Sequence, residues 1–178
     1  EVVFGINNPD MLSNYNSFYN KTDINDLYAV DRDNLVQNIY SGFGDNLKAI
    51  IDVRARQWTE SNDQGGSSVS YSQNGTYISN KFNISANSNL PALVDFQPLI
   101  RVTEMYYIIA ETTTDDIEAL NSINLVLENR GLDKLTSKDE IPATILSEYQ
   151  KEFWGEGQLF FYYKRINASS IPSAMTGG

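Results

Sequence analysis

The chain of 178 residues is 41% hydrophobic and 20% charged, a balance that suits a single globular domain with its own core. Its net charge of −10 argues against a nucleic-acid partner. The absence of cysteine and histidine excludes disulfides, thiol nucleophiles, ordinary zinc sites and histidine acid–base catalysis. No apolar run reaches the roughly 18 residues that suggest a membrane-spanning helix. The first residues, EVVFGINN, lack the regions of a signal peptide.

The beginning of the chain is predicted to consist mostly of loops. Val2 to Ile6 is a short apolar run that predicts a strand or a buried extended segment. Residues 7–33 are polar and show little periodicity, which indicates loops. Tyr15, Tyr19 and Tyr28 lie in this segment. One hypothesis is that they pack locally under a long loop. The alternative is a stacking surface for a flat ligand, because aromatic rings are stiff and the neighbouring asparagines can hydrogen-bond hydroxyl groups.

Two helices are predicted next, over Asn34–Tyr40 and Asp45–Trp58, with glycines between them. Trp58 joins the three tyrosines as a tentative ligand-binding residue. In the second predicted helix, Asp52 and Arg54 are expected to form a structural ion pair, because such pairs are common and usually modest in effect.

Residues 60–97 are predicted to be irregular apart from one extended segment. Residues 60–75 are rich in Ser, Asn, Gln and Gly, which is typical of a flexible loop. Tyr77–Ile84 alternates weakly between apolar and polar side chains, which favours a strand.

The strongest helical signal is a hairpin formed by Pro98–Glu111 and Asp115–Arg130. In both segments apolar residues recur three or four positions apart and therefore share one face. A proline in a first helical turn loses no hydrogen bond. Asp115 can cap the second helix, and Gly131 stands where a left-handed C-cap residue belongs. Because the connection is short, we expect the two helices to be antiparallel neighbours in contact.

The rest of the chain is predicted to contain a further helix and a packed aromatic segment. Ser137–Glu140 reads S-K-D-E, a capping box, so we expect a tight first turn and then a regular helix from Pro142. Leu159–Tyr163 is continuously apolar or aromatic, and must pack as a short helix or an extended segment.

This helical region resembles the C-terminal signature of the SusD/RagB family. The family pattern P-L-I-R-x-A-E-x-Y-L-x-x-A-E is met, with Thr103 at the usual alanine, by Pro98, Leu99, Ile100, Arg101, Glu104, Tyr106, Ala110 and Glu111. The pattern N-x-x-R-x-R-x-G-L is met only by Asn124, Arg130, Gly131 and Leu132. The pattern E-x-x-x-E-L-x-x-E-G-x-x-x-x-D-L-x-R, with Tyr162 at the usual aspartate, is met by Glu148, Glu152, Phe153, Glu156, Gly157 and Arg165.

The resemblance implies a fold and a division of the chain. The fold would be mainly α, a tetratricopeptide-like helical scaffold with long irregular loops and a few short strands. Residues 1–97 would be a loop-rich, variable, ligand-facing region, residues 98–167 the SusD-like C-terminal helical region, and residues 168–178 a flexible tail. Because family members are several times longer, the chain would be the C-terminal part of a larger protein, with its lipid anchor outside this chain.

The resemblance also implies a function. The chain would be a glycan-binding protein and not an enzyme, exposed at the outer-membrane surface, that delivers oligosaccharides to a SusC-like TonB-dependent transporter. It would use no cofactor and no metal. Two alternatives stay open: a peptide-binding RagB-like protein, and a glycosidase that uses helical glutamates.

The glutamates of the third motif could serve either as structural ion-pair partners or as catalytic acids. Glu148, Glu152 and Glu156 are spaced four apart. Retaining glycosidases hold two carboxyls about 5 Å apart and inverting ones about 6.5–9.5 Å apart, which helical spacing alone does not establish. The favoured interpretation is ion pairing with the nearby arginines Arg101, Arg130 and Arg165.

Two finer expectations concern packing. Because Tyr162 removes the family's aspartate, Arg165 should find another acid, with Glu152 or Glu156 the nearest in sequence, since an unpaired buried charge is costly. A helical hairpin also cannot bury both faces alone. The second face would be covered either by a part of a longer protein or by loops from residues 1–98. The first case would show as an exposed patch of residues such as Ile108, Ile123, Val126 or Phe160.

Overall fold

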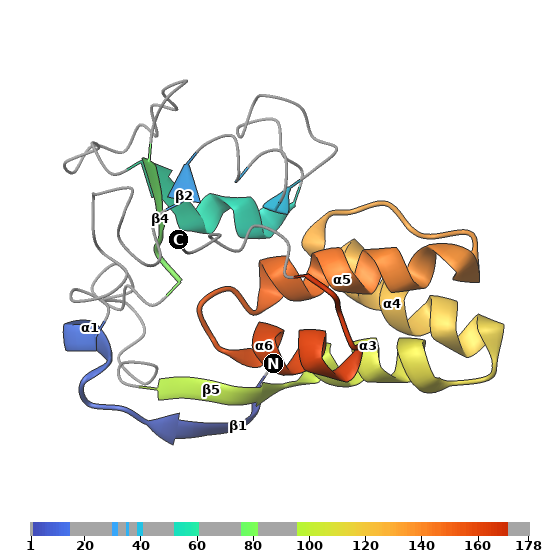
Figure 1. Cartoon of the computed structure of the whole chain (residues 1–178), viewed down its shortest axis with the longest axis horizontal. Coiled ribbons are helices and arrows are strands. Elements are labelled where there is room, and N and C mark those ends of the chain that lie inside the picture. The colour runs from blue at the N-terminus through green and yellow to red at the C-terminus, as the bar shows by residue number, and fades with distance from the viewer. Residues whose placement is uncertain are drawn as a thin grey trace.

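The computed structural model of the chain describes residues 2–14, 30–31, 35, 39–40, 52–60, 76–81 and 96–170. In this part the fold is mainly α, with two small antiparallel sheets (Figure 1). The helices are α1 (Met11–Asn14), α3 (Val102–Thr112), α4 (Asp116–Arg130), α5 (Ile141–Glu152) and α6 (Gln158–Arg165), with the 3₁₀ helices η4 (Val53–Gln57) and η7 (Lys138–Glu140). The strands are β1 (Val2–Asn7), β2 (Val30–Asp31), β3 (Trp58–Glu60), β4 (Thr76–Ser79) and β5 (Phe96–Arg101).

The predicted strand at the start of the chain is confirmed as β1, which pairs antiparallel with β5. This pairing corrects the prediction of a helix over Pro98–Glu111, because Pro98 to Arg101 belong to β5 and α3 begins only at Val102. Pro98 lies opposite Gly5 in the register. A proline has no N–H to donate, which a strand with a free edge tolerates. The local helical signal of P-L-I-R therefore yields to a strand partner far away in the sequence.

The helical hairpin is confirmed from Val102 onward, with α3 packed against α4. The Asp115 carboxylate caps α4 and accepts hydrogen bonds from the backbone N–H groups of Ile117 (2.9 Å) and Glu118 (3.3 Å). Gly131 ends the helix with φ of 81°, in the left-handed region that glycine adopts without strain. Both ends of α4 thus lie where the sequence places them.

Helices α5 and α6 complete the helical layer. The Ser137 hydroxyl accepts from the backbone N–H of Asp139 (3.2 Å), and η7 leads directly into α5. The expected tight turn before a regular helix is confirmed. The aromatic run Leu159–Tyr163 is helical and belongs to α6.

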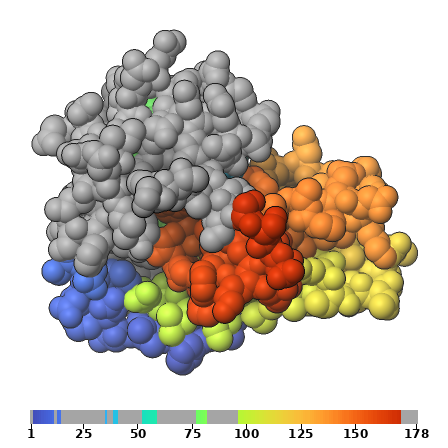
Figure 2. All heavy atoms as spheres, viewed as in Figure 1, coloured from blue at the N-terminus to red at the C-terminus, as the bar shows by residue number. Residues whose placement is uncertain are grey.

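Helix α6 runs alongside α3 in the same direction. Near its start, Gln158 donates to the carbonyl of Leu99 (3.4 Å), and at its end Arg165 pairs with Glu111 (2.7 Å). Figure 2 shows α6 in red at the centre of this face, beside the orange α5.

Helices α3, α4, α5 and α6 bury one continuous core. Aromatic rings pack through its centre, with Tyr149 stacked on Tyr162 at 4.3 Å and tilted against Phe153 at 4.9 Å between ring centroids. The buried members of the core are Tyr107, Ala110, Ala119, Ile123, Val126, Leu127, Ile141, Ile145, Tyr149, Phe153, Tyr162 and Tyr163.

A second, smaller core lies beside the first and includes Leu35, Ile39, Tyr40, Ala55, Trp58 and Tyr77, with Trp154 packed against it. Here the prediction of a regular helix over Asp45–Trp58 is wrong where it can be checked, because Val53–Gln57 is a 3₁₀ helix and Trp58 begins β3. Strand β3 pairs with β4, which confirms the first half of the strand predicted over Tyr77–Ile84. Most of the helix predicted over Asn34–Tyr40 lies outside the described residues.

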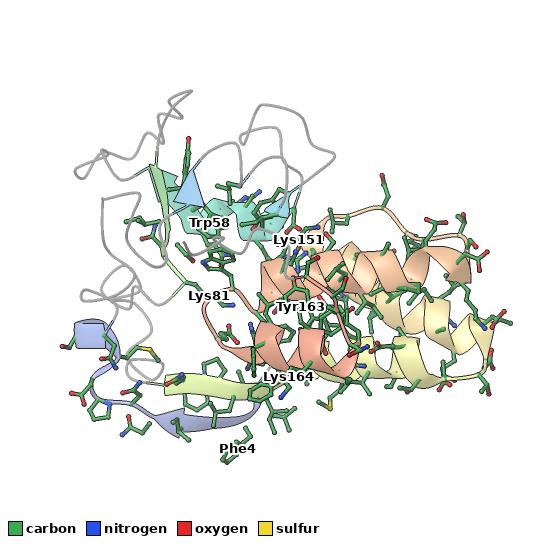
Figure 3. The ribbon with its side chains drawn as sticks, in the orientation of Figure 1. Phe4, Trp58, Lys81, Lys151, Tyr163 and Lys164 are labelled. Atoms are coloured by element: carbon green, nitrogen blue, oxygen red, sulfur yellow. The ribbon has the colours of Figure 1, made fainter. Side chains whose placement is uncertain are left out.

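The expected exposed patch is only half present. Ile108 is 40% and Phe160 55% exposed, whereas Ile123 is 0% and Val126 6% exposed. The last two face inward because α4 turns that side toward α3 and α5. Other apolar side chains project outward from the strand pair, as Phe4 does in Figure 3.

Replacing Ile123 by alanine is expected to lower the free energy of unfolding by about 2–5 kcal/mol, because it opens a cavity in the helical core. Ile117 lies on the same helix but is 70% exposed, so Ile117→Ala should change that free energy by no more than about 0.5 kcal/mol. Urea unfolding of both variants measures the difference. Equal losses would contradict the packing described for α4.

Candidate functional site

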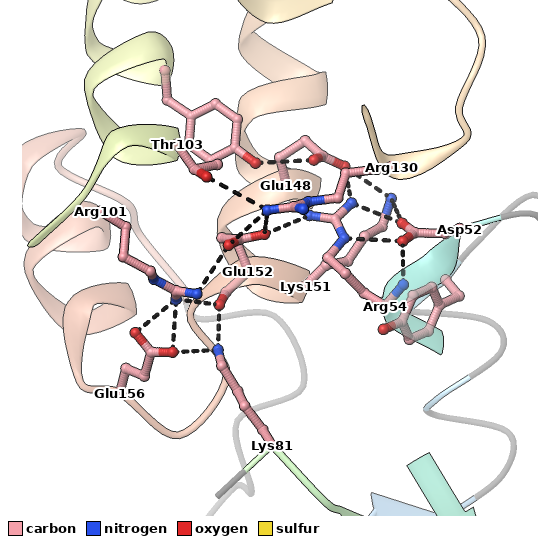
Figure 4. Close-up of polar contacts among 12 residues, drawn as sticks. Asp52, Arg54, Lys81, Arg101, Thr103, Arg130, Glu148, Lys151, Glu152 and Glu156 are labelled. Carbon is pink, nitrogen blue, oxygen red and sulfur yellow. Dashed lines mark hydrogen bonds and ion pairs between the residues drawn. The ribbon is translucent and has the colours of Figure 1, made fainter. Parts of the chain in front are cut away.

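A network of buried charges joins α5 to η4 (Figure 4). Glu148 and Glu152 lie four apart on α5 and therefore share one face. They are 1% and 4% exposed. Glu156 follows the end of α5, with its side chain 4% exposed. A buried carboxylate is costly unless cations and hydrogen-bond donors satisfy it, so the partners determine whether this arrangement is stable.

Asp52 and Arg54 bring the earlier part of the chain into the network. The Asp52 carboxylate caps η4 by accepting from the backbone N–H of Arg54 (3.0 Å), and also accepts from its Nε (2.9 Å) and Nη2 (2.7 Å). Arg54 further donates to Glu148 (2.8 Å) and Glu152 (3.2 Å). The predicted ion pair is confirmed. It is buried, and it links η4 to a helix about ninety positions later in the chain.

Glu152 accepts hydrogen bonds from three guanidinium groups. Besides Arg54, Arg101 donates from Nη1 at 3.0 Å, and Arg130 donates from Nη2 to both oxygens at 3.1 Å. Arg101 precedes α3 and Arg130 ends α4, and the antiparallel hairpin brings these two positions together. Glu152 therefore ties both open ends of the hairpin to α5, which confirms the predicted pairing with Arg101 and Arg130.

Glu156 is satisfied by a second set of donors. Arg101 Nη2 donates to both of its oxygens, at 2.6 and 2.7 Å. Lys81, which follows β4, pairs with the Glu156 carboxylate and donates to the backbone carbonyl of Glu152. The Arg101 guanidinium lies 5.0 Å from the ring centroid of Phe153, close enough for cation–π attraction. The expectation that Glu156 pairs with an arginine in the core is confirmed.

Glu148 closes the other side of the network. The Tyr107 hydroxyl donates to its Oε2 (3.0 Å), and Lys151 Nζ donates to its Oε1 (3.2 Å). Lys151 Nζ also lies 3.8 Å from the Asp52 carboxylate. Figure 3 shows Lys151 directed from α5 toward η4.

These contacts determine the protonation of the network. Burial by itself raises the pKa of Glu152, but the positive charges of Arg101 and Arg130 outweigh it and hold the pKa below its ordinary value. Burial raises the pKa of the Tyr107 hydroxyl well above its ordinary value, so this group stays a hydrogen-bond donor. Burial also lowers the pKa of Lys81, against the pull of the Glu156 carboxylate.

The same contacts make the glutamates poor acid–base catalysts. A glycosidase acid needs a raised pKa so that it holds a proton near neutral pH. The pKa of Glu152 moves in the opposite direction. Glu148, Glu152 and Glu156 are each engaged by at least two cations. Among the described residues, no group of three or more acidic side chains is placed to hold a metal ion.

Two cavities border the network. The larger, of about 390 Å³, is lined by Leu127, Gly131, Leu132, Asp133, Leu135, Ala143, Thr144, Ser147, Glu148 and Lys151. The other, of about 300 Å³, lies between α3 and α4 and is lined by Val102, Thr103, Tyr106, Leu125, Val126, Asn129 and Arg130. Each cavity is lined by at least one charged residue of the network. A ligand in either cavity would therefore contact both polar and apolar groups.

Of the four tentative ligand-binding residues, Trp58 lies in the described part of the chain. Trp58 is 1% exposed, donates from Nε1 to the Tyr40 hydroxyl (3.2 Å), and packs edge-on against Trp154 at 5.5 Å between ring centroids. Its ring faces the smaller core in this structure and offers no open face to a ligand. Tyr15, Tyr19 and Tyr28 lie outside the described residues, so their role stays a prediction.

Arg165 finds an acid, but not one of the two nearest in sequence. It pairs with Glu111 at 2.7 Å, because α6 runs alongside α3 and because Glu152 and Glu156 are already taken by other cations. Its guanidinium also lies 5.2 Å from the ring centroid of Tyr162. Tyr162 itself stacks on Tyr149, so its ring fills space in the core as expected.

Sequence reasoning missed three members of the network, Lys81, Tyr107 and Lys151. Lys151 follows Glu148 by three positions on the predicted helix, a spacing that would have suggested the pair. Lys81 gave no such signal, because its partner Glu156 is far away in the sequence and nothing local marks the lysine as buried.

Comparison with known proteins identifies a family. A family model described as the SusD family matches residues 12–171. Searches of curated proteins and of solved structures found no significant match. Among the described residues, no helix combines the length and apolar character needed to cross a membrane.

Replacing Glu152 by glutamine is expected to lower the free energy of unfolding by about 3–5 kcal/mol, because the buried Arg54 and the partly buried Arg101 and Arg130 then share too few negative charges. The matched control is Glu128→Gln. Glu128 pairs with Lys134 but its side chain is 49% exposed, so the loss should stay below about 1 kcal/mol. Chemical unfolding at neutral pH measures both.

The pH dependence gives a second check. Because the pKa of Glu152 is lower in the folded chain than in the unfolded chain, its contribution is complete above the unfolded value. The contribution is lost as the pH falls through the folded value. The gap in unfolding free energy between the native sequence and Glu152→Gln should therefore narrow from pH 7 to about pH 3. A gap that stayed constant would show that the Glu152 charge is not what stabilises the fold.

Proposed function

Because the chain belongs to the SusD family, we propose that it captures oligosaccharides at the cell surface and delivers them to a SusC-like TonB-dependent transporter. Proteins of this family bind nutrients and are associated with the outer membrane. The observation that carries the proposal is the family match over residues 12–171, which takes in both the loop-rich region and the helical region.

The arrangement of the buried charges supports a binding protein over an enzyme. The family-motif acids Glu148, Glu152 and Glu156 are committed to pairing with arginines and lysines inside the scaffold. The network fastens η4, and Lys81 just beyond β4, to the helical region. We propose that this attachment gives the loop-rich region 1–97 a rigid base from which its side chains reach the ligand.

The proposal extends to the rest of the protein. The helical region 98–167 would be the part of a tetratricopeptide-like scaffold that carries the ligand-facing loops, with residues 168–178 a flexible tail. The membrane attachment would be a lipid anchor outside this chain. No nucleic acid takes part, in keeping with the net charge of −10. A peptide in place of the glycan is the second outcome that the binding experiment separates.

Calorimetric titration with a panel of neutral oligosaccharides and short peptides is expected to give binding to a glycan. Replacing Tyr15, Tyr19 or Tyr28 by alanine should weaken that binding up to about tenfold, since an aromatic contact contributes about 0.5–1.5 kcal/mol beyond its buried area. The control is Phe161→Ala on α6, an aromatic residue that is 70% exposed and should leave the affinity unchanged.

Peptide binding without glycan binding would replace the glycan in this proposal with a peptide. A turnover assay on the same glycans tests the catalytic alternative. We expect no hydrolysis, and hydrolysis that disappeared in a folded Glu152→Gln variant would overturn the proposal.

A further inference from the structure

The cavity between α3 and α4 has a composition that points to a ligand of its own. Its walls are Val102, Thr103 and Tyr106 from the first turns of α3, and Leu125, Val126, Asn129 and Arg130 from the last turns of α4. It thus combines apolar walls with hydroxyl, amide and guanidinium groups. This site is separate from the loops proposed above to hold the transported glycan.

Arg130 is the least satisfied arginine of the charge network. Arg54 has Asp52 and Glu148 as further acids, and Arg101 has Glu156. In the described part of the chain, Arg130 pairs only with Glu152, which Arg54 and Arg101 also use.

The hydrogen bonds of Arg130 show the same shortage. The side-chain hydrogen bonds that Arg130 makes to described residues all start from Nη2. Two go to Glu152, and a long one goes to the Thr103 hydroxyl (3.4 Å). Its Nε is buried without an acceptor, and Nη1 makes no hydrogen bond to a described residue. The side chain keeps 26% of its surface exposed. A cationic group with spare donors therefore borders an open cavity.

The start of α3 contributes the partial positive charge of a helix N-terminus near the cavity, opposed by Glu104 in the same first turn. The residue before the helix, Arg101, provides no side-chain cap, so the first-turn N–H groups are left without the side-chain acceptor that often satisfies them. The N-terminal end of a helix carries a partial positive charge that favours anions. Val102 and Thr103, which line the cavity, belong to this first turn.

We propose that the cavity between α3 and α4 is a binding site for a small carboxylate, which accepts a charge-assisted hydrogen bond from Arg130 Nη1. Hydrogen bonds between a guanidinium and a carboxylate are shorter and stronger than neutral ones. The Thr103 hydroxyl and the Asn129 side chain also line the cavity, and the Asn129 Nδ2 already donates to the Leu125 carbonyl (2.7 Å), which leaves its amide oxygen to accept from a ligand hydroxyl group. Val102, Leu125 and Val126 contact its apolar surface.

The volume restricts the ligand to a single small unit. At about 300 Å³ the cavity lies at the lower limit of small-molecule sites. It suits one acidic sugar, or the carboxyl-terminal residue of a peptide. Both sources present the same carboxylate chemistry, and the choice between them is left to experiment.

Calorimetric titration with galacturonate and with galactose tests the proposal. We expect galacturonate to bind at least tenfold more tightly than the neutral sugar, and the affinity to fall as salt is added. Trialanine with a free carboxyl terminus, compared with its amidated form, distinguishes a peptide source from a sugar source. Binding of either carboxylate in preference to its neutral counterpart supports the site, and binding of neither overturns it.

Substitutions in and outside the cavity test whether the carboxylate binds there. Arg130→Gln should reduce the affinity for the carboxylate at least tenfold, whereas Arg165→Gln should not change it, because Arg165 pairs with Glu111 outside the cavity. Because Arg130→Gln also disturbs Glu152, a second variant fills the cavity and leaves the charges intact. Leu125 is 43% exposed, so Leu125→Trp should fold and abolish binding. Carboxylate binding that survived Leu125→Trp would place the site elsewhere and refute the proposal.

Discussion

The pairing of buried carboxylates on and just after α5 with arginines from three other parts of the chain holds this structure together. The Glu152 carboxylate by itself accepts hydrogen bonds from Arg54, Arg101 and Arg130. A hydrophobic core attracts its members without direction, whereas charged hydrogen bonds require defined donors at defined angles. The network therefore fixes the position of the smaller core around Trp58 relative to the helical core. Removing one partner leaves the remaining buried charges with fewer opposite charges to balance them, which makes the arrangement sensitive to single substitutions.

The family motif has a physical explanation in the geometry of the helix ends. Its arginines and glutamates occupy the positions where helix ends converge, since Arg101 precedes α3, Arg130 ends α4 and Glu152 ends α5. An antiparallel hairpin necessarily brings the start of one helix near the end of the next. A carboxylate placed between these ends neutralises both arginines. The acids of the motif, Glu148, Glu152 and Glu156, are accordingly scaffold contacts.

Much of the helical region could be predicted because its signals are local. The Asp115 cap and Gly131 fixed the ends of α4, and the Ser137 turn led correctly into α5. The misplaced start of α3 has a different cause, since Pro98 to Arg101 pair with a strand at the other end of the chain. No pattern within P-L-I-R reveals that partner.

The candidate site was predictable only in part for the same reason. The spacing of Glu148 and Glu152 indicated a shared face, and the motif supplied Arg101 and Arg130 as partners. The burial of Lys81 and the shift of Arg165 to Glu111 depend on how distant segments meet in space. A tryptophan suits a ligand surface and a core equally well, so residue type alone did not show that Trp58 is buried in the smaller core.

A double-mutant cycle between Arg54 and Glu148 measures most directly whether the network joins the two cores. Arg54→Gln, Glu148→Gln and the double variant would be compared by their free energies of unfolding at neutral pH. The two side chains meet at 2.8 Å and are almost fully buried, so the account predicts a coupling energy of about 1–3 kcal/mol. A coupling energy below about 0.5 kcal/mol, as for distant independent sites, would contradict it.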